Sequence, residues 1–440
     1  CTIIAEAGEF SDGERHYLPV LSDKQMVVEN TSIQLRGNET KTMEVKELFN
    51  SGSLSAENGK LRIEMTANPQ WHIISSLPVL SSPVSNDAIS WATSFYANSL
   101  SRHIVRNNPK IKTVFDTWMQ YEKKSDDFLS ELKRNEELKN IVMSETPWLV
   151  EAENDEMRKQ QIAFLFDDNG MNSRLAASVT RLKELQMPDG SWSWFGGMTG
   201  NRYITTQIAV MIARLKNMGV DISSEVDDMY SKSIAYLRSE VYKDYLKMIE
   251  DGKKYGPVDM DIKYLYICSI DKQAMDNADK KVNSYIIDRL KGKSPELSIY
   301  EKSIFAAIMS AGGQKQEAKT LLESVMEYMV QNEEMGAYFD TYKSEYTYMS
   351  YRIPSHVAAM EAIIRLGDNK EQLLDDMKLW LLKQKQVQQW ETPVASVDAI
   401  YAFLVSDGGN LDNTSVMTAN IGTTAISTPD DAIGFIGRDF

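Results

Sequence analysis

The amino-acid sequence predicts an α+β multidomain protein, mainly α, in which an α/α toroid is inserted into a small antiparallel β-sandwich. Three observations lead to this fold class. Short segments near both ends alternate apolar and polar residues, as strands with one buried face do. The long middle part repeats apolar residues with the helical period. Within that part, short tryptophan-bearing motifs recur, which is typical of stacked helical hairpins.

Length and composition place the chain among ordinary globular proteins. Its 440 residues suggest about three domains, and 42% apolar with 25% charged residues excludes a disordered chain. A formal net charge of −15 argues against nucleic acid and anionic membranes as partners, because both bind cationic surfaces. The two cysteines, Cys1 and Cys268, rule out a disulfide framework. No apolar stretch approaches the ~18–20 residues that a membrane-spanning helix needs.

Strands are expected at both ends of the chain. Gly37 with Asn38 supplies a turn between two of them, and the helical pattern stops after Gly409. The expected strands are 33–36, 42–46, 61–66, 414–421 and 423–427. Because neither end can bury a core alone, one sandwich built from both ends is the economical arrangement.

Between about Pro69 and Ser406 the pattern predicts roughly a dozen helices. Apolar residues recur at helical spacing in 208–215, 304–311 and 322–329. Glycines and prolines separate these segments at intervals that suit short helices. The whole block is therefore expected to be α.

Weak repeats inside the helical block predict the toroid. The pair Gln186 and Trp192 is echoed by Gln384 and Trp390 at the same separation. A second motif begins at 204, 353 and 394, and its Ser and Thr side chains are expected to act as helix N-caps. Hairpins repeated at this irregular spacing favour a closed ring over an open solenoid. The side chains of Trp192, Trp194 and Trp390 are expected to wedge between neighbouring hairpins in a structural role.

The chain carries no recognisable catalytic, metal or cofactor motif. Its four histidines have no second His or Cys at ligand spacing, so no metal site is predicted. The glycine run 196–200 lacks the Lys and Ser/Thr of a phosphate loop, and no cofactor is expected. The chain is therefore predicted not to be an enzyme. A toroid enzyme with an unmarked carboxylate pair among the 63 acidic residues stays open as a third hypothesis.

A series of short segments, in order along nearly the whole chain, is similar to one known family. The longest is Leu-Gln-Met-Pro-Asp-Gly-Ser-Trp-Ser-Trp-Phe at 185–195, and Phe-Tyr-Ala-Asn-Ser-Leu occurs at 95–100. The other segments are 14–21, 68–71, 76–80, 146–149, 165–167, 203–205 and 390–393. Together they resemble the bacterial alpha-2-macroglobulins, in which a helix like 95–100 follows an internal thioester.

The resemblance implies a domain plan for the chain. Residues 1–30 would form the end of a macroglobulin-like β-domain, and residues 31–67 the first half of a CUB-like β-sandwich. Residues 68–408 would form a thioester-domain-like toroid, and residues 409–440 the second half of the sandwich. The bait region and most macroglobulin domains would lie upstream.

The chain departs from the family at the thioester itself. Active members carry Cys-x-Glu-Gln shortly before that helix, and counting back places the tetrad on Asp87, Ala88, Ile89 and Ser90. Asp87 offers no thiol and Ser90 no carboxamide, so the bond cannot form. Cys268, the only cysteine of the helical block, is expected to be a buried packing residue.

The resemblance therefore implies the C-terminal region of a thioester-less bacterial alpha-2-macroglobulin, a protease inhibitor that traps its target noncovalently. Its partners would be proteases, met by the full-length protein in the periplasm or cell envelope. A lipid anchor, where present, would lie at an N-terminus outside this chain, and Cys1 is expected to lie mid-domain. The alternative is a binding or scaffolding module for cell-envelope proteins that has no inhibitor activity.

Overall fold

The computed structural model describes all of the chain except a set of short segments and one long one. The described residues are 2–8, 10–15, 33, 35, 38–44, 61–68, 70–119, 162, 165–272, 275–340, 352–367, 370–385, 390–406, 415–429 and 434–439. Cys1, the segment 146–149 and two of the four residues of the expected strand 33–36 lie outside them.

The described part is mainly helical with small two-stranded antiparallel sheets, which confirms the predicted class at this level. The strands are β1 (Thr2–Ala7), β2 (Phe10–Arg15), β3 (Arg62–Thr66), β4 (Met329–Asn332), β5 (Gly336–Phe339), β6 (Thr418–Ile421), β7 (Thr424–Ser427) and β8 (Phe435–Asp439). The pairs are β1 with β2, β3 with β8, β4 with β5 and β6 with β7. Residues 42–44 were expected to begin a strand but form none; they are exposed, so no buried face favours strand pairing there.

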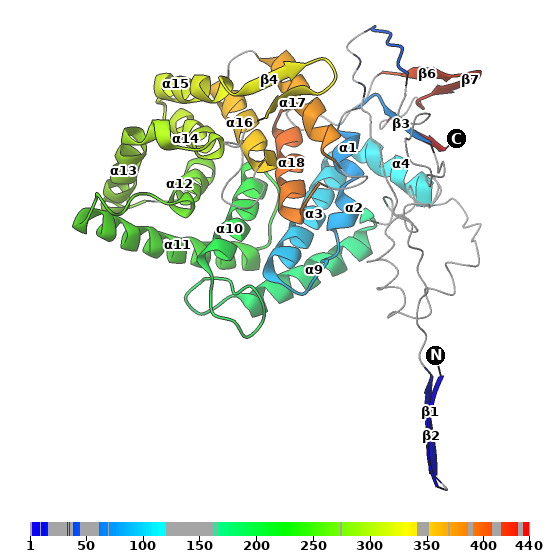
Figure 1. The fold of residues 1–440 in the computed structure, drawn as a ribbon, viewed down its shortest axis with the longest axis horizontal. Helices are drawn as coiled ribbons and strands as arrows, with labels where there is room; N and C mark the ends of the chain where they lie inside the picture. The colour runs from blue at the N-terminus through cyan, green and yellow to red at the C-terminus, as the bar shows by residue number, and fades with distance from the viewer. Residues whose placement is uncertain are drawn as a thin grey trace.

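The helices occupy the region between β3 and β6 (Figure 1). They are α1 (Trp71–Ile74), α2 (Leu77–Leu80), α3 (Ala88–Asn107), α4 (Pro109–Met119), α9 (Asp168–Leu185), α10 (Arg202–Asn217), α11 (Ser224–Glu250), α12 (Asp259–Asp271), α13 (Asn277–Gly292), the short η2 (Ser294–Glu296), α14 (Ile299–Ala311), α15 (Lys315–Met326), α16 (Arg352–Leu366), α17 (Glu371–Lys383) and α18 (Pro393–Ser406).

Six of these helices contact one another in a closed series. Helix α3 packs on α10, α10 on α12, α12 on α14, α14 on α16 and α16 on α18, and α18 returns to α3. We call these six helices the inner ring. Helices α14 and α18 have buried side chains on almost every side, as expected for helices enclosed by protein. Helices α9, α11, α15 and α17 pack on the inner ring, and α13 packs on α11.

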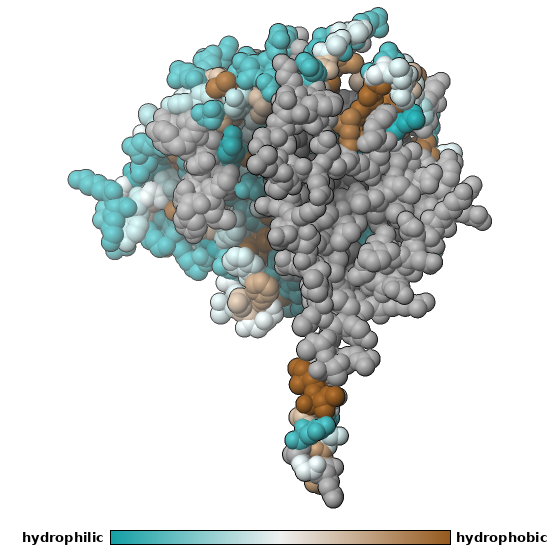
Figure 2. Space-filling view, turned by 45° about the vertical axis from the view of Figure 1, so that its right-hand side comes forward, coloured by the Kyte–Doolittle hydropathy of each residue, from teal (hydrophilic) through white to brown (hydrophobic). Residues whose placement is uncertain are grey.

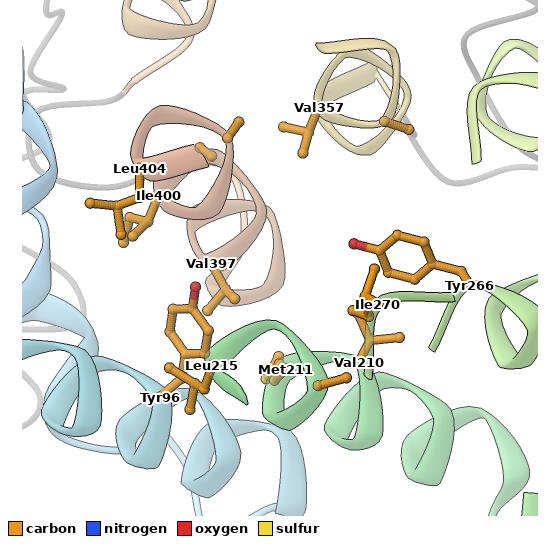
Figure 3. Close-up of a cluster of buried hydrophobic side chains, with 14 of the residues drawn as sticks. Tyr96, Val210, Met211, Leu215, Tyr266, Ile270, Val357, Val397, Ile400 and Leu404 are labelled. Carbon is orange, nitrogen blue, oxygen red and sulfur yellow. The ribbon is translucent and has the colours of Figure 1, made fainter. Parts of the chain in front are cut away.

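The hydrophobic core lies where inner-ring helices meet. Tyr96 of α3, Met211 of α10, Tyr266 of α12 and Ile400 of α18 belong to one cluster of buried side chains (Figure 3). Each of these side chains is at most 3% exposed. Burial of this apolar surface is the main force that holds the inner ring together.

The strands on either side of the helical block pair with each other. Thr66, just before the helices, is opposite Phe435, which follows them, and Arg62 is opposite Asp439. The rings of Phe435 and Trp71 of α1 have centroids 4.6 Å apart. The helical block is therefore an insertion between two hydrogen-bonded strands that are distant in sequence.

The β1–β2 hairpin extends away from the helices (Figure 1). Its residues Ile3, Ile4 and Phe10 are 58%, 64% and 82% exposed, and hydrophobic side chains are visible on it in Figure 2. Within the described part of the chain, this hairpin pairs only with itself.

Two details of the predicted helices are wrong. The helix expected over 322–329 ends with α15 at Met326, and Met329 begins β4 instead. Strand β4 pairs with β5, whose residues Ala337 and Phe339 are buried, and this pairing takes Met329 out of the helix. The motif hydroxyls are not N-caps, since they lie inside α10, α16 and α18. Asn201 caps α10 instead, and its Oδ1 accepts a hydrogen bond from the Ile204 backbone N–H at 3.1 Å.

Candidate functional site

The four residues that the sequence resemblance assigns to the thioester tetrad, Asp87, Ala88, Ile89 and Ser90, lie at the start of α3. Asp87 is the N-cap of the helix, with φ −107° and ψ 161°. Its Oδ1 accepts hydrogen bonds from the backbone N–H groups of Ile89 at 2.9 Å and Ser90 at 3.0 Å. Its Oδ2 accepts from the hydroxyl of Ser90 at 2.7 Å and from the hydroxyl of Ser85. Both oxygens of the carboxylate are therefore engaged in holding the helix start.

Hydrogen bonding keeps this carboxylate charged. Burial raises the pKa of Asp87, but the hydrogen bonds from Ser85, Ser90 and Ile89 outweigh it, so the pKa lies below its ordinary value. The hydrogen bonds that the Asp87 carboxylate accepts are those of a helix cap.

The start of α3 is fixed to the tryptophan-bearing turn between α9 and α10. The backbone N–H of Ala88 donates to the carbonyl oxygen of Trp194 at 2.9 Å. Nearby, the Oδ1 atom of Asn86 accepts from Trp91 Nε1 at 2.9 Å and from Arg181 Nε at 3.0 Å. The structure thus brings together two of the regions that the sequence singled out.

Trp194 does not wedge between hairpins as expected. Its side chain is 47% exposed, and its ring stacks on that of Phe195 with centroids 6.2 Å apart. Met198 and Val84 are also exposed, at 53% and 71%. Trp194 contacts α3 through its backbone carbonyl, and its ring remains at the surface.

Trp192 and Trp390 are buried and make equivalent hydrogen bonds. The indole N–H of Trp192 donates to the Leu182 carbonyl at 2.9 Å, and that of Trp390 donates to the Leu381 carbonyl at 2.7 Å. Each indole therefore binds the end of the helix that precedes its turn. Their backbone N–H groups also match, since Trp192 donates to Thr205 Oγ1 at 2.8 Å and Trp390 to Ser396 Oγ at 3.1 Å.

A buried polar network inside the inner ring was not predicted from the sequence. Arg214 of α10 forms an ion pair with Asp398 of α18, and its Nε donates to the Tyr266 hydroxyl at 3.1 Å. Tyr266 donates to Glu361 Oε2 of α16 at 2.8 Å. Glu361 Oε1 also accepts from Arg365 Nε at 2.8 Å and from the Tyr401 hydroxyl at 3.3 Å. The partners come from four helices, so no local motif announces them.

The charges within the network balance one another. Burial lowers the pKa of Arg214, but Tyr266, Asp398 and Glu361 more than reverse this, and its pKa lies well above the ordinary value. Burial and then Glu361 raise the pKa of Tyr401 to about 12, so its hydroxyl keeps its proton at neutral pH. Two arginines face two carboxylates, and each carboxylate contacts an arginine. Asp398 thereby connects α18 to α10, and Glu361 connects α16 to α12.

Neither a metal-binding cluster nor a membrane-spanning helix is found among the described residues. Among them, no three His, Cys, Asp or Glu side chains gather closely enough to hold a metal ion. None of the helices in the described ranges has the length and hydropathy of a membrane span. Cys268 lies buried in α12, and burial raises the pKa of its thiol to about 11, so the thiol stays protonated at neutral pH.

Comparisons with known proteins give structural neighbours only. No protein-family model matches the chain, and no curated protein matches it in sequence. The native conformation of E. coli alpha-2-macroglobulin has TM-score 0.45 and 8% identity, covering 87% of this chain and 19% of that one. A crystal structure of the E. coli protein from domain MG7 to the C-terminus has TM-score 0.46 and 8% identity, covering 86% and 48%. A Salmonella alpha-2-macroglobulin mutant has TM-score 0.42 and 7% identity, covering 87% and 22%. The chain thus spans less than half of each of these chains.

Proposed function

We propose that this chain is the C-terminal region of a thioester-less bacterial alpha-2-macroglobulin-like protein, and that the whole protein inhibits proteases by trapping them noncovalently. The ordered series of family-like segments in the sequence supports the proposal. A helical block between the paired strands β3 and β8 is the arrangement expected of a toroid inserted into a CUB-like sandwich. On this proposal the protein acts in the periplasm or cell envelope, and its partners are proteases.

One observation carries the noncovalent part of the proposal. At the position aligned with the thioester cysteine, Asp87 caps α3 and its carboxylate accepts four hydrogen bonds. At the position aligned with the glutamine, Ser90 donates its hydroxyl to Asp87. A helix cap has replaced the electrophile, so capture must depend on enclosure or on an interface.

Inhibition is tested by incubating the full-length protein with several endoproteases. We expect cleavage of an upstream bait segment, reduced protease activity on large protein substrates, and retained activity on small peptide substrates. Protease and inhibitor should separate under denaturing conditions because no covalent bond joins them. The absence of both bait cleavage and inhibition would refute the proposed function.

Loss of the thioester is tested by mass spectrometry after methylamine treatment. We expect no mass increase, because an acyl group that methylamine attacks is missing. A family member that retains Cys-x-Glu-Gln, treated in parallel, should gain one methylamine adduct. An adduct on this chain would overturn the assignment of Asp87 and Ser90.

The alternative is a cell-envelope binding module without inhibitor activity, and the exposed pair Trp194 and Phe195 favours it. Contiguous exposed apolar patches mark interaction sites, and Trp is enriched among the residues that dominate binding energy at interfaces. Pull-down from an envelope extract separates the two functions, since it should recover proteases in one case and cell-wall or membrane-complex proteins in the other. A Trp194→Ala, Phe195→Ala double variant should lose the latter.

A further inference from the structure

A buried histidine, His356, lies at the contact between the inner-ring helix α16 and the outer helix α17. It belongs to α16 and is 0% exposed. Its Nε2 atom lies 3.0 Å from the Met377 backbone oxygen of α17. Because a carbonyl oxygen only accepts hydrogen bonds, Nε2 is the donor, and the neutral ring carries its proton there. The other ring nitrogen, Nδ1, has no hydrogen-bond partner among the described residues.

Aromatic rings of the outer elements surround this imidazole. Its centroid lies 4.4 Å from that of Trp380 in α17 and 6.1 Å from that of Phe339 in β5. Tyr338 of β5 stacks on the same indole, with centroids 6.2 Å apart. Trp380 Nε1 also has no partner in the described part of the chain, but it is a donor and cannot accept a hydrogen bond. A protonated Nδ1 would therefore be a buried donor without an acceptor, which costs free energy.

Among the described residues, no carboxylate pairs with His356. The acids of the surrounding helices have other partners, namely Asp375 with Lys378 in α17, Glu361 with Arg365 in α16, Asp398 with Arg214 and Glu301 with Ser298. Asp376 of α17 is likewise engaged, and Asp340 and the charged side chains of α15 are exposed. Of the cations, Lys302 of α14 donates to the Ser324 hydroxyl at 3.0 Å, and Arg352 lies over the Trp380 ring at 5.8 Å. Burial lowers the pKa of His356 to about 4, and the hydrogen bond to Met377 raises it only in part.

Helix α17 and the β4–β5 hairpin pack against each other, and both contact α16 (Figure 1). We propose that His356 is an acid-sensitive latch, which holds α17 and the hairpin on the inner ring when neutral and releases them when protonated. Release exposes the imidazole to water, where its pKa returns to the ordinary 6.5. Since the pKa is about 4 in the closed state, the latch is fully closed above pH 6.5 and weakens as the pH falls from 6.5 toward 4. This device is independent of the proposed inhibitor function.

The latch is tested by hydrogen–deuterium exchange of the 440-residue chain at about pH 7 and about pH 5. After correction for the intrinsic exchange rate, protection of the amides in α17 and the β4–β5 hairpin should fall about twentyfold, the factor that pKa values of 6.5 when open and about 4 when closed give. Amides of the inner-ring helices α10 and α12 should keep their protection. An equal fall in all of these elements would indicate global unfolding, and either that result or unchanged protection of α17 would overturn the proposal.

Variants that do not titrate assign the effect to His356. His356→Gln keeps an N–H donor for Met377, and His356→Phe keeps an aromatic ring in case the glutamine variant does not fold. In either variant, protection of α17 should no longer depend on pH between 7 and 5. His103→Gln, at a half-buried histidine of α3, is the matched control and should retain the fall seen in wild type. A fall of wild-type size in the His356 variants would assign the acid sensitivity to another group, such as His72, whose pKa burial also lowers to about 4, and would refute the latch.

Discussion

At the residue scale, one carboxylate organises the start of α3. Asp87 gives its two oxygens to four hydrogen bonds, and Ser85 and Ser90 point their hydroxyls at it. The assignment of Asp87 and Ser90 to thioester positions rests on the sequence resemblance alone and stays a prediction. The sequence also contains the cap, since Asp immediately before a helical segment is a standard N-terminal signal. The part played by Ser85 depends on the folded loop and has no sequence signal.

The Asp87 cap should make stability depend on acid. Its folded-state pKa lies below the ordinary 3.8, so its contribution is present above that value and is lost as pH falls through the folded pKa. Asp87→Asn keeps a capping oxygen but does not titrate. We expect the wild-type chain to lose more thermal stability than Asp87→Asn when pH drops from neutral to below 3.8. Thermal unfolding followed by circular dichroism measures this.

The contribution of the Asp87 cap to the free energy of unfolding is tested by Asp87→Ala. Loss of an N-cap costs about 0.5–2 kcal/mol of unfolding free energy, and we expect a value toward the upper end because two serine hydroxyls also lose their acceptor. Urea denaturation of wild type, Asp87→Ala and Asp87→Asn at neutral pH gives the comparison. Equal stability of all three would show that the cap is dispensable.

At the element scale, the repeated tryptophan turns lock each preceding helix to the next inner-ring helix. The sequence predicts their existence, because Gln186 with Trp192 and Gln384 with Trp390 repeat the same spacing. It does not separate Trp192 from Trp194, since the two lie two residues apart in one irregular turn and only the fold decides which is buried. The β4–β5 hairpin was missed for a related reason. Its second strand, β5, packs against the neighbouring helices α16 and α17, and this tertiary contact overrides the local helical pattern that extended to Met329.

Removing the indole N–H should destabilise both turns equally. Trp192→Phe and Trp390→Phe each leave a helix-end carbonyl, that of Leu182 or Leu381, without its donor and open a small cavity. We expect a loss of about 2 kcal/mol in each case. Trp194→Phe, at an exposed ring, should change stability by less than about 0.5 kcal/mol. Unequal losses in Trp192→Phe and Trp390→Phe would contradict the equivalence of the two buried turns. An equal loss in Trp194→Phe would show that burial of the indole is not what matters.

The turn before Trp192 also depends on a glycine. Gly190 has φ +89°, and a Cβ there would lie 2.3 Å from the Lys232 carbonyl oxygen of α11. Gly197 has a similar φ of +83° but no atom within 4 Å of the added Cβ. Gly197→Ala should cost about 1–2 kcal/mol from backbone strain alone, and Gly190→Ala should cost clearly more. Urea denaturation measures both losses, and the difference between them is the free-energy cost of the clash between a Cβ at position 190 and α11.

At the scale of the whole molecule, burial and a polar network act together in the inner ring. Apolar periodicity makes the helices predictable, but it does not say which faces meet around a ring. The partners Arg214 and Asp398 are 184 residues apart, and Tyr266 and Glu361 are 95 apart. No local motif encodes contacts at such separations. The repeats predicted a closed ring, but the order of contacts around it and its central polar network emerge only when the chain is folded.

Breaking this network should destabilise the chain more than removing a charge from an exposed ion pair does. Glu361→Leu removes the acceptor shared by Tyr266, Tyr401 and Arg365 and leaves a buried cation. We expect a loss of about 3–5 kcal/mol. The exposed pair Lys232 and Asp228 supplies the control, since Asp228→Asn should cost no more than about 0.5 kcal/mol. Comparable melting temperatures for Glu361→Leu and wild type would contradict the role of the network.

The pairing of β3 with β8 determines how the molecule responds to tension. Arg62 and Asp439 form the outer end of this ladder, and Thr66 and Phe435 form the end next to the helices. A pull on the two flanks of the chain therefore opens the ladder like a zip, one rung after another, before any load reaches α1 or α18. The outermost rung carries the force first, and the ring of helices stays shielded until the rung between Thr66 and Phe435 has parted.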